Sequence, residues 1–156
     1  NIKLVGSHPG MDDGPDGASH HALEDLALTR VLPGLTILTP ADAEEIAEAF
    51  EQAAKIKGPV YIRVAREPII HVATLKPFNE QAFYRLVEGC PLIATLENHT
   101  VNGGLGGLIA ETLAQKAHPA RLTRLGTPDT FTESGNSRQL KAKYGISGEA
   151  LFNALR

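Results

Sequence analysis

The alternation of short β-branched runs with amphipathic helical patterns is the feature that most constrains the fold. Apolar runs of strand length occur at residues 2–5, 35–38, 60–64, 69–72, 92–96 and 121–125. Helical periodicity separates most of them, over residues 22–31, 41–55, 79–88, 104–117, 137–144 and 147–155. Because parallel strands are joined by crossover helices, this alternation predicts an α/β protein with largely parallel sheets.

The clearest helical pattern covers residues 41–55. Thr39 precedes it as a candidate N-cap, Pro40 suits a first turn, and the apolar positions recur with helical spacing. We therefore expect an amphipathic helix that covers one face of a sheet.

One junction violates the alternation. The runs 60–64 and 69–72 are separated by only four residues, whereas neighbouring parallel strands need a crossover of about a dozen residues or more. We expect that the chain either passes between domains here or lacks residues between Pro68 and Ile69. Both cases place a boundary there, with domains at 1–68 and 69–156. Each half is small for an α/β domain, so self-association or a partner subunit is expected to cover apolar surface.

Charge and hydropathy exclude two classes of partner. The formal net charge is −3 with a pI near 6.1, so no cationic stripe is available for nucleic acid. No apolar run reaches the roughly 20 residues that span a bilayer, and no signal peptide is recognisable at the start. These features predict a cytoplasmic protein. The single cysteine, Cys90, is expected to be a small buried hydrophobe.

Residues 7–21, named here the histidine loop, contain three histidines, three aspartates and several glycines after a predicted strand. Glycines let backbone approach a ligand, and His with Asp supplies neutral, cationic and anionic groups near neutral pH. The alternative is a polar turn in which Ser19 or Asp16 caps the next helix. A calcium loop is excluded by its spacing, because Leu23 stands where the ligating glutamate would fall. No G-x-S-x-G elbow supports a serine hydrolase.

A zinc site formed by His8, His20 and His21 is a weaker alternative. Adjacent histidines at the start of a helix point in different directions, which is unfavourable for shared coordination. We therefore expect no metal ligands in this chain.

A second glycine-rich segment, residues 97–107, follows a predicted strand and leads into a helix. That context suits anion binding, but Ile109 stands at the third glycine position of a G-x-G-x-x-G motif. Tight packing of the helix start against a sheet or a partner is the preferred interpretation.

An arginine at the end of the run 60–64 would lie at the carboxyl edge of a parallel sheet, where α/β proteins bind ligands. Alternation puts Tyr61 and Arg63 on one face, while Arg66 leaves the other face toward the edge. The planar guanidinium of Arg66 suits a sugar phosphate. A salt bridge with Glu67 or Asp16 is the competing interpretation.

These residues together resemble a known family over essentially the whole chain. The segments 14–20 (GPDGASH), 23–28 (LEDLAL) and 39–42 (TPAD) are similar to the pyrimidine-binding domain of transketolases. Residues 60–68 resemble the end of that domain. The C-terminal domain of the family is resembled by residues 74–78, 96–106 and 126–135. The register is most similar to the C-terminal subunit of split transketolases.

The resemblance implies two three-layer parallel-sheet domains, both incomplete in this chain. Family members have about sixty more residues between the counterparts of Pro68 and Ile69. The glutamate that activates thiamine diphosphate in the family precedes the counterpart of Asn1, so its presence in a longer protein is open. The diphosphate and Mg²⁺ are held in the family by another domain, which implies an N-terminal transketolase subunit as partner.

The resemblance also assigns four site residues. His8 matches a histidine that binds the donor sugar near its carbonyl, and Asp16 matches an aspartate that binds a donor hydroxyl. His20 matches a histidine beside the cofactor's amino group and the reacting carbon, suited to proton transfer. Arg66 matches an arginine that binds the sugar phosphate.

Three positions depart from the family. His21 stands where glutamine is common, and Asp12 and Asp13 replace small or apolar residues. Two added carboxylates near a phosphate site are expected to weaken phosphate binding.

The implied function is transfer of a two-carbon ketol unit between sugar phosphates, as in the pentose phosphate pathway, with thiamine diphosphate and Mg²⁺. Activity would require the partner subunit. The alternatives are a non-catalytic scaffold or regulatory remnant of the same fold, and a related subunit of the deoxyxylulose-phosphate synthase or 2-oxo acid dehydrogenase β type.

Overall fold

The computed structural model describes residues 1–65 and 72–156. Its strands are β1 (Lys3–Ser7), β2 (Thr36–Leu38), β3 (Val60–Val64), β4 (Thr74–Lys76), β5 (Leu92–Thr100) and β6 (Arg121–Thr127). Its helices are the 3₁₀ helix η1 (Gly10–Asp16) and α1 (Asp25–Arg30), α2 (Ala43–Lys55), α3 (Glu80–Leu86), α4 (Leu105–Gln115), α5 (Ser137–Lys143) and α6 (Gly148–Ala154). The predicted α/β class is confirmed.

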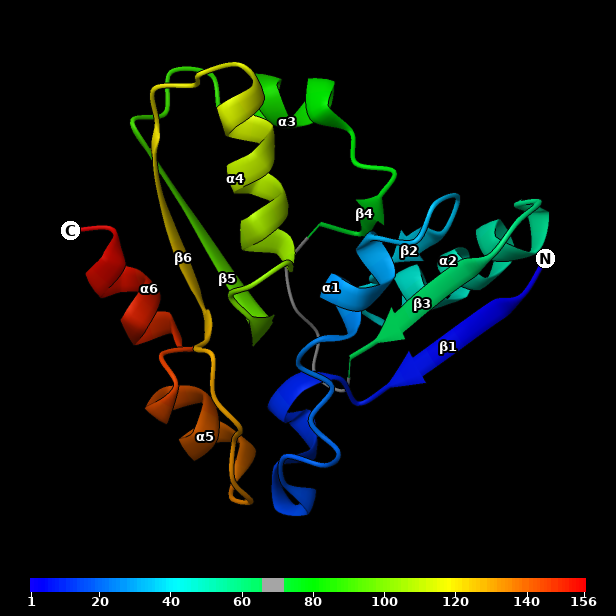
Figure 1. Cartoon of the computed structure of the whole chain (residues 1–156), viewed down its shortest axis with the longest axis horizontal. Helices are drawn as coiled ribbons and strands as arrows, with labels where there is room; N and C mark the ends of the chain where they lie inside the picture. The colour runs from blue at the N-terminus through cyan, green and yellow to red at the C-terminus, as the bar shows by residue number, and fades with distance from the viewer. Residues whose placement is uncertain (66–71) are drawn as a thin grey trace.

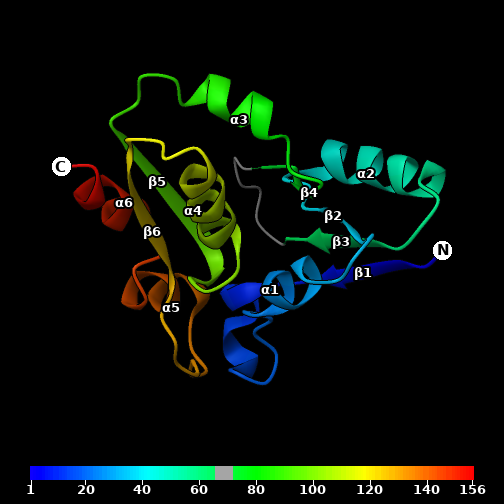
Figure 2. The same cartoon turned by 45° about the horizontal axis from the view of Figure 1, so that its top comes forward.

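The first sheet has the order β1-β3-β2-β4 and lies between α2 and α1 (Figure 2). β1, β3 and β2 are parallel, whereas β4 pairs with β2 in the antiparallel sense. The expectation of parallel strands therefore holds for the first three and is wrong for β4. β4 follows the expected domain boundary in sequence yet completes this sheet.

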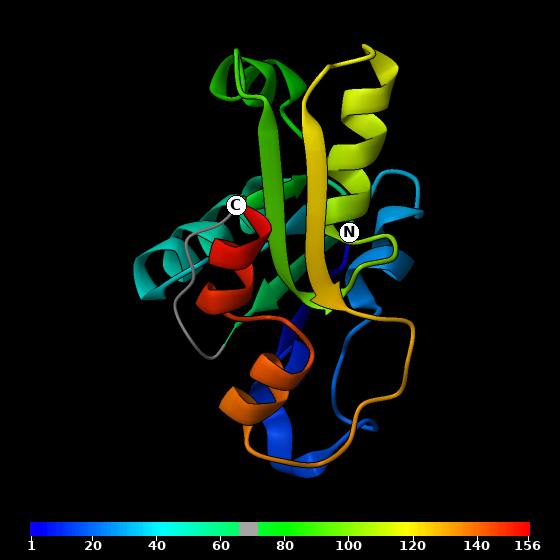
Figure 3. The ribbon, with the colours of Figure 1, turned by 90° about the vertical axis from the view of Figure 1, so that its left-hand side faces the viewer.

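The second sheet contains the parallel strands β5 and β6. Figure 3 shows α4 beside one face of this pair and α6 beside the other. β5 continues to Thr100, four residues beyond the expected strand. Part of the second glycine-rich segment is therefore strand and not loop.

Helix α2 begins slightly later than its sequence pattern suggested. Asp42 is the N-cap, and its carboxylate accepts a hydrogen bond from the Glu45 amide at 2.9 Å. Thr39 instead donates its hydroxyl to the Val72 carbonyl at 2.6 Å. The expected cap was wrong because aspartate, placed directly before the helix, caps as well as threonine.

The two sheets are joined by a shared apolar cluster. Met11 and Leu23 pack with Leu140 and Ile146, and Leu96 of β5 lies against them. Figure 1 shows η1 and α5 side by side at the lower edge of the molecule. The histidine loop therefore packs on the second sheet's helices as well as on the first sheet. No helix in the described part of the chain is long and apolar enough to cross a membrane.

Candidate active site

The candidate site lies at the carboxyl edge of the first sheet. Ser7, the last residue of β1, is in register with Val64, the last residue of β3. The chain segments that leave both strands therefore start at the same edge, the place predicted for ligand binding. His8 is the first residue beyond this edge on β1.

His8 has a backbone φ of 56°, a left-handed conformation that is uncommon for residues other than glycine. Its amide donates to the Val64 carbonyl at 3.1 Å, which extends the β1–β3 ladder by one residue. The His8 side chain is exposed. The backbone is thus fixed in an unfavourable conformation while the imidazole stays accessible, an arrangement typical of functional positions.

Asp16 and His20 lie on the far side of the same loop. Asp16 ends η1, and Gly17 turns the chain with a φ of 75°. The Gly17 carbonyl accepts the amides of His20 at 2.9 Å and of His21 at 3.2 Å. The side chains of Asp16 and His20 are exposed, and His20 Nδ1 is 2.9 Å from the Ser19 hydroxyl. Within the described residues, no hydrogen bond joins His8, Asp16 and His20 to one another.

Arg66, the fourth predicted site residue, lies outside the described residues, as does Glu67, its competing partner. Its role therefore stays a prediction. The alternation used to choose it is supported at the described positions, because Tyr61 and Arg63 both contact the same carboxylate, that of Asp25.

His21 points into the protein. It is buried, with Nδ1 2.7 Å from the Thr132 hydroxyl and Nε2 3.2 Å from the Asp13 carbonyl. Both ring nitrogens are occupied by protein groups, so His21 links the loop to the segment after β6. Among the described residues, no group of three or more His, Cys, Asp or Glu side chains is placed to hold a metal ion.

Asp12 does not present an uncompensated charge to the site. Its buried carboxylate pairs with Lys141 Nζ at 2.7 Å and accepts a hydrogen bond from Asn98 Nδ2 at 2.8 Å. The expectation that Asp12 would weaken phosphate binding is therefore wrong, because α5 supplies a cation that neutralises it.

A buried polar cluster behind the loop was missed by sequence reasoning. Asp25, at the start of α1, accepts hydrogen bonds from the Tyr61 hydroxyl and from Arg63 Nε, both at 2.7 Å. Arg63 also donates to the carbonyls of Ala22 at 3.4 Å and Asn98 at 3.1 Å. Burial and the bond to Asp25 raise the pKa of the Tyr61 phenol. The only sequence signal was an arginine within an apolar strand, which requires a buried partner.

His99 and Glu97 extend this cluster on β5. His99 is fully buried, Nδ1 lies 2.7 Å from the Thr100 carbonyl, and the Ala27 amide donates to Nε2 at 3.4 Å. These partners require a neutral ring with its proton on Nδ1, and burial lowers the pKa of His99. The carboxylates 3.8 and 3.9 Å away are therefore neighbours and not ion-pair partners.

Glu97 explains the second glycine-rich segment. Its carboxylate accepts the amides of Leu105 at 2.7 Å and Gly106 at 2.9 Å, so the start of α4 is already occupied by an anionic group of the protein. A Cβ on Gly104 would lie 2.0 Å from Glu97 Oε2. Burial raises the pKa of Glu97, and the two amide bonds partly offset this. The preferred interpretation, tight packing in place of phosphate binding, is supported.

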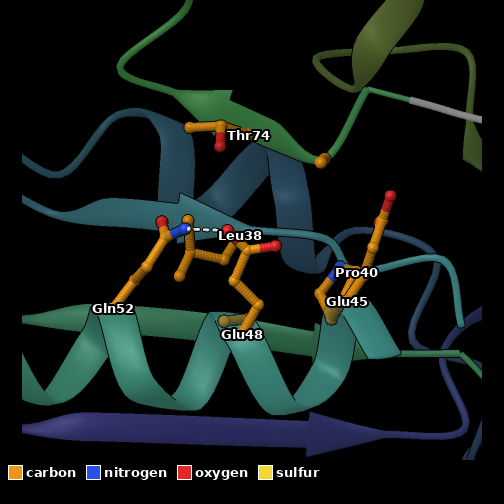
Figure 4. A pocket seen from close by; sticks show the side chains of 8 residues that line it. Leu38, Pro40, Glu45, Glu48, Gln52 and Thr74 are labelled. Atoms are coloured by element: carbon orange, nitrogen blue, oxygen red, sulfur yellow. Dashed lines mark hydrogen bonds between the residues drawn. The ribbon is translucent and has the colours of Figure 1, made fainter. Parts of the chain in front are cut away.

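Two surface hollows lie away from the predicted residues. One, of about 150 Å³, lies between α2 and β4, with Glu45 and Glu48 on its wall (Figure 4). Gln52 donates to Glu48 there at 2.8 Å. The other, of about 630 Å³, lies between α1 and the segment after β6. Neither is lined by His8, Asp16 or His20. Cys90 is half-buried and makes no disulfide.

Comparison with known families supports the resemblance seen in the motifs. The transketolase pyrimidine binding domain matches residues 1–69, and the transketolase C-terminal domain matches residues 65–151. The second match alone covers more than half of the chain.

Several similar proteins are parts of divided enzymes. The 6-deoxy-6-sulfo-D-fructose transketolase subunit SqwH of Clostridium sp. is 29% identical, covering 99% of this chain and 64% of the relative. One of the two subunits of apulose-4-phosphate transketolase from Phocaeicola vulgatus is 26% identical, covering 97% and 65%. A solved structure, described as "Split gene transketolase, inactive beta4 tetramer", has a TM-score of 0.85 and 28% identity, covering 99% and 66%.

The chain thus spans just under two thirds of the length of these curated relatives. The match to the Clostridium protein runs over 206 residues, 50 more than the 156 residues of this chain. This excess supports the prediction that relatives contain internal residues that this chain lacks. The expected joint, Pro68–Ile69, lies outside the described residues.

Both family matches, together with a structural likeness over nearly the whole chain, lead to one conclusion. The chain belongs to the transketolase family, with that family's pyrimidine-binding and C-terminal domains.

Proposed function

We propose that the chain is a subunit of a thiamine diphosphate-dependent split transketolase, and that it transfers a two-carbon ketol unit together with an N-terminal partner subunit. Two of its relatives are themselves named as transketolase subunits, which supports a divided enzyme. Self-association of this chain is part of the proposal, because the structural relative is a tetramer. A cytoplasmic location and a place in the pentose phosphate pathway stay predictions, as does the boundary between residues 68 and 69.

One observation carries the proposal: the histidine loop is fixed by its interior contacts while its reactive side chains remain outside. Met11, Asp12 and His21 are buried and bonded. His8 and His20 are exposed at the carboxyl edge. A merely structural loop has no need of exposed histidines on a backbone fixed in this way.

Each exposed side chain has a chemical role in this proposal. His8 donates a hydrogen bond to the donor carbonyl, and Asp16 accepts one from a donor hydroxyl. Nε2 of His20 makes no hydrogen bond within the described residues, so it is free to exchange a proton with the hydroxyl that forms or disappears at the reacting carbon. Preorganisation of these groups lowers the reorganisation required in the transition state.

The residues present fit only part of the cofactor. When bound, thiamine diphosphate supplies the nucleophilic carbon and the electron sink for cleaving the carbon–carbon bond. In this chain, the exposed imidazole of His20 suits the cofactor's amino group as a hydrogen-bond partner. Mg²⁺ and the diphosphate are assigned to the partner subunit.

The substrate class follows from Arg66 and from the neutralised Asp12. A guanidinium at the sheet edge suits a sugar that bears an anionic group at its far end, either a phosphate or a sulfonate. The Clostridium relative is named for a sulfo-sugar and the Phocaeicola relative for a sugar phosphate. Asp12 no longer opposes either anion, because Lys141 compensates its charge.

The alternatives make different demands. A non-catalytic remnant of the fold would keep the buried network without needing accessible His8, Asp16 and His20. A deoxyxylulose-phosphate synthase or 2-oxo acid dehydrogenase β type would condense or oxidise a 2-oxo acid. Assaying ketose donors and pyruvate side by side separates these classes.

The test is reconstitution with the partner subunit, Mg²⁺, thiamine diphosphate and phosphorylated or sulfonated ketose donors. Ketol transfer is expected from the mixture and not from this chain alone. Turnover by the isolated chain would contradict the divided-enzyme proposal. No turnover by a mixture whose cofactor binding is verified would favour the non-catalytic alternative.

Two variants then test the site. His20→Ala is expected to lower kcat by about 10² to 10⁴ with little change in KM, as for loss of a proton-transfer group. His118→Ala is the matched control, because His118 lies between α4 and β6 and its ring bonds the Ala120 amide, away from the histidine loop. Arg66→Ala is expected to raise the KM of the anionic sugar, with a loss of roughly 1.5 to 3 kcal/mol for a charge-assisted hydrogen bond. Unchanged kinetics in both variants would refute the assignment.

A further inference from the structure

We propose that Asn98, on β5 of the second sheet, is a positioning residue that sets the conformation of the loop carrying His8. The proposal rests on the function proposed above, since it assigns Asn98 an effect on donor binding through His8. Asn98 itself is only partly exposed and lies behind the loop, so it acts through backbone and not through the substrate.

One amide group holds the backbone on both sides of Gly10. Asn98 Oδ1 accepts the Met11 amide at 2.9 Å, and Nδ2 donates to the Pro9 carbonyl at 3.4 Å. Nδ2 also donates to Asp12 Oδ1 at 2.8 Å. The side chain thus substitutes for a neighbouring strand at the point where β1 has no ladder partner.

The fit around Gly10 leaves little freedom. Gly10 has a φ of 69°, and a Cβ there would lie 2.3 Å from the Asn98 side chain. The Gly10 amide donates to the Ala22 carbonyl at 3.1 Å. His8, two residues earlier, is held with its φ of 56°. A left-handed residue persists only where its surroundings over-determine it, and Asn98 supplies several of those bonds from a single side chain.

The opposite faces of β5 perform different tasks. Glu97 and His99 point toward α4 and α1, and alternation places Asn98 and Leu96 on the other face, toward η1 and α5. Lys141 of α5 holds Asp12, the residue that Asn98 also bonds. The second sheet therefore contributes to the site without touching the substrate.

The contacts predict which part of the loop loosens when the amide is lost. Asn98→Ala leaves the buried Met11 amide without its acceptor and removes one donor from Asp12. Residues 8–14 should then exchange amide hydrogens faster, while α2, which is packed on the other side of the first sheet, should not.

The matched control is Asn79→Ala. Asn79 caps α3 by accepting the Ala82 amide at 3.0 Å, and α3 makes no contact with the histidine loop in the hydrogen bonds described. Loss of a cap destabilises the same chain by a comparable mechanism, the loss of asparagine bonds to backbone. It should leave residues 8–14 unaffected.

The experiment uses the full-length chain with its partner subunit, thiamine diphosphate and Mg²⁺. Hydrogen exchange by mass spectrometry of the 8–14 segment is the readout that does not depend on activity. Donor kcat/KM is the second readout, and Asn98→Ala is expected to lower it about 10- to 100-fold, as for a misplacement of about 1 Å near the site. The KM of the acceptor should change less than that of the donor.

A reciprocal exchange provides a rescue. Asn98→Asp alone places a carboxylate 2.8 Å from that of Asp12, so it should disturb the loop strongly. The double variant Asp12→Asn with Asn98→Asp restores one donor facing one acceptor and keeps the net charge. It should recover most of the donor kcat/KM and of the exchange protection. A general packing role for Asn98 does not predict this recovery.

The outcomes are distinguishable. Faster exchange in 8–14 together with reduced donor kcat/KM supports the proposal. Equal behaviour of Asn98→Ala and Asn79→Ala in both readouts overturns it, and so does faster exchange with unchanged donor kinetics. If the wild-type pair transfers no ketol unit, the proposed function fails. Exchange in 8–14 then still decides whether Asn98 fixes the loop.

Discussion

Replacing Arg63 tests whether the buried cluster joins the two sheets. The side chains of Arg63 and Asp25 are 11% and 14% exposed. Arg63→Met removes two bonds to the Asp25 carboxylate and the bonds to the carbonyls of Ala22 and Asn98. Removing one member of a buried ion pair reduces the free energy of unfolding by about 3 to 5 kcal/mol. We expect about 3 kcal/mol, at the lower end of the range for a broken buried pair, because the Tyr61 hydroxyl still donates to Asp25.

Urea denaturation followed by far-UV circular dichroism measures this loss, since the chain has no tryptophan. Asp25→Asn and the double variant complete a double-mutant cycle, in which coupling of about 2 kcal/mol is expected. Glu111→Gln is the control, because the Arg30–Glu111 pair is 62% exposed on its acidic side and such pairs contribute only about 0.2 to 1 kcal/mol. A coupling indistinguishable from zero, or an Arg63→Met loss no larger than that of the control, would refute the reasoning.

Three further outcomes can be measured in the same way. Because burial lowers the pKa of His99 below its ordinary 6.5, the unfolded chain takes up a proton first as the pH falls below about 6.5. Wild-type stability should then fall relative to His99→Asn by at most about 1.4 kcal/mol per pH unit. Glu97, whose pKa is raised above 4.5, makes stability fall as pH rises above about 4.5, and both proteins share this opposite slope. Gly10→Ala should destabilise more than Gly34→Ala, since both have a positive φ but only the first Cβ would meet another side chain within 4 Å. Thr127→Val should be neutral or stabilising by about 1 kcal/mol, because the buried hydroxyl has no partner among the described residues.

The sequence predicts the elements well because their signals are local. β3 has the predicted bounds, and the other expected elements that lie in the described residues are present within a few positions. Local patterns fail where the partner is distant in sequence. Nothing near Asp25 indicates that Tyr61 and Arg63 will bond to it. Likewise, the length of β5 depends on pairing with β6 up to Thr127, a contact that the β5 sequence does not contain.

The histidine loop shows the same division between composition and geometry. Its residue types identify it as a functional segment, and the exposure of His8, Asp16 and His20 agrees with that interpretation. Composition does not tell which acidic residue faces inward, and Asp12 was misjudged for this reason. The deciding group, Lys141, comes from α5, more than a hundred residues later.

The two sheets therefore depend on each other at the site. Asn98 provides a carbonyl to Arg63 and a side-chain amide to the loop, so a single residue of β5 contacts both the cluster behind α1 and the segment that carries His8. Met11 is fully buried only because α5 and the segment after it cover it. In the absence of the second sheet, Met11 would face water and the backbone polar groups flanking Gly10 would lose their partners. The exposed, chemically useful face of the loop can exist only because its other face is satisfied by the C-terminal part of the chain.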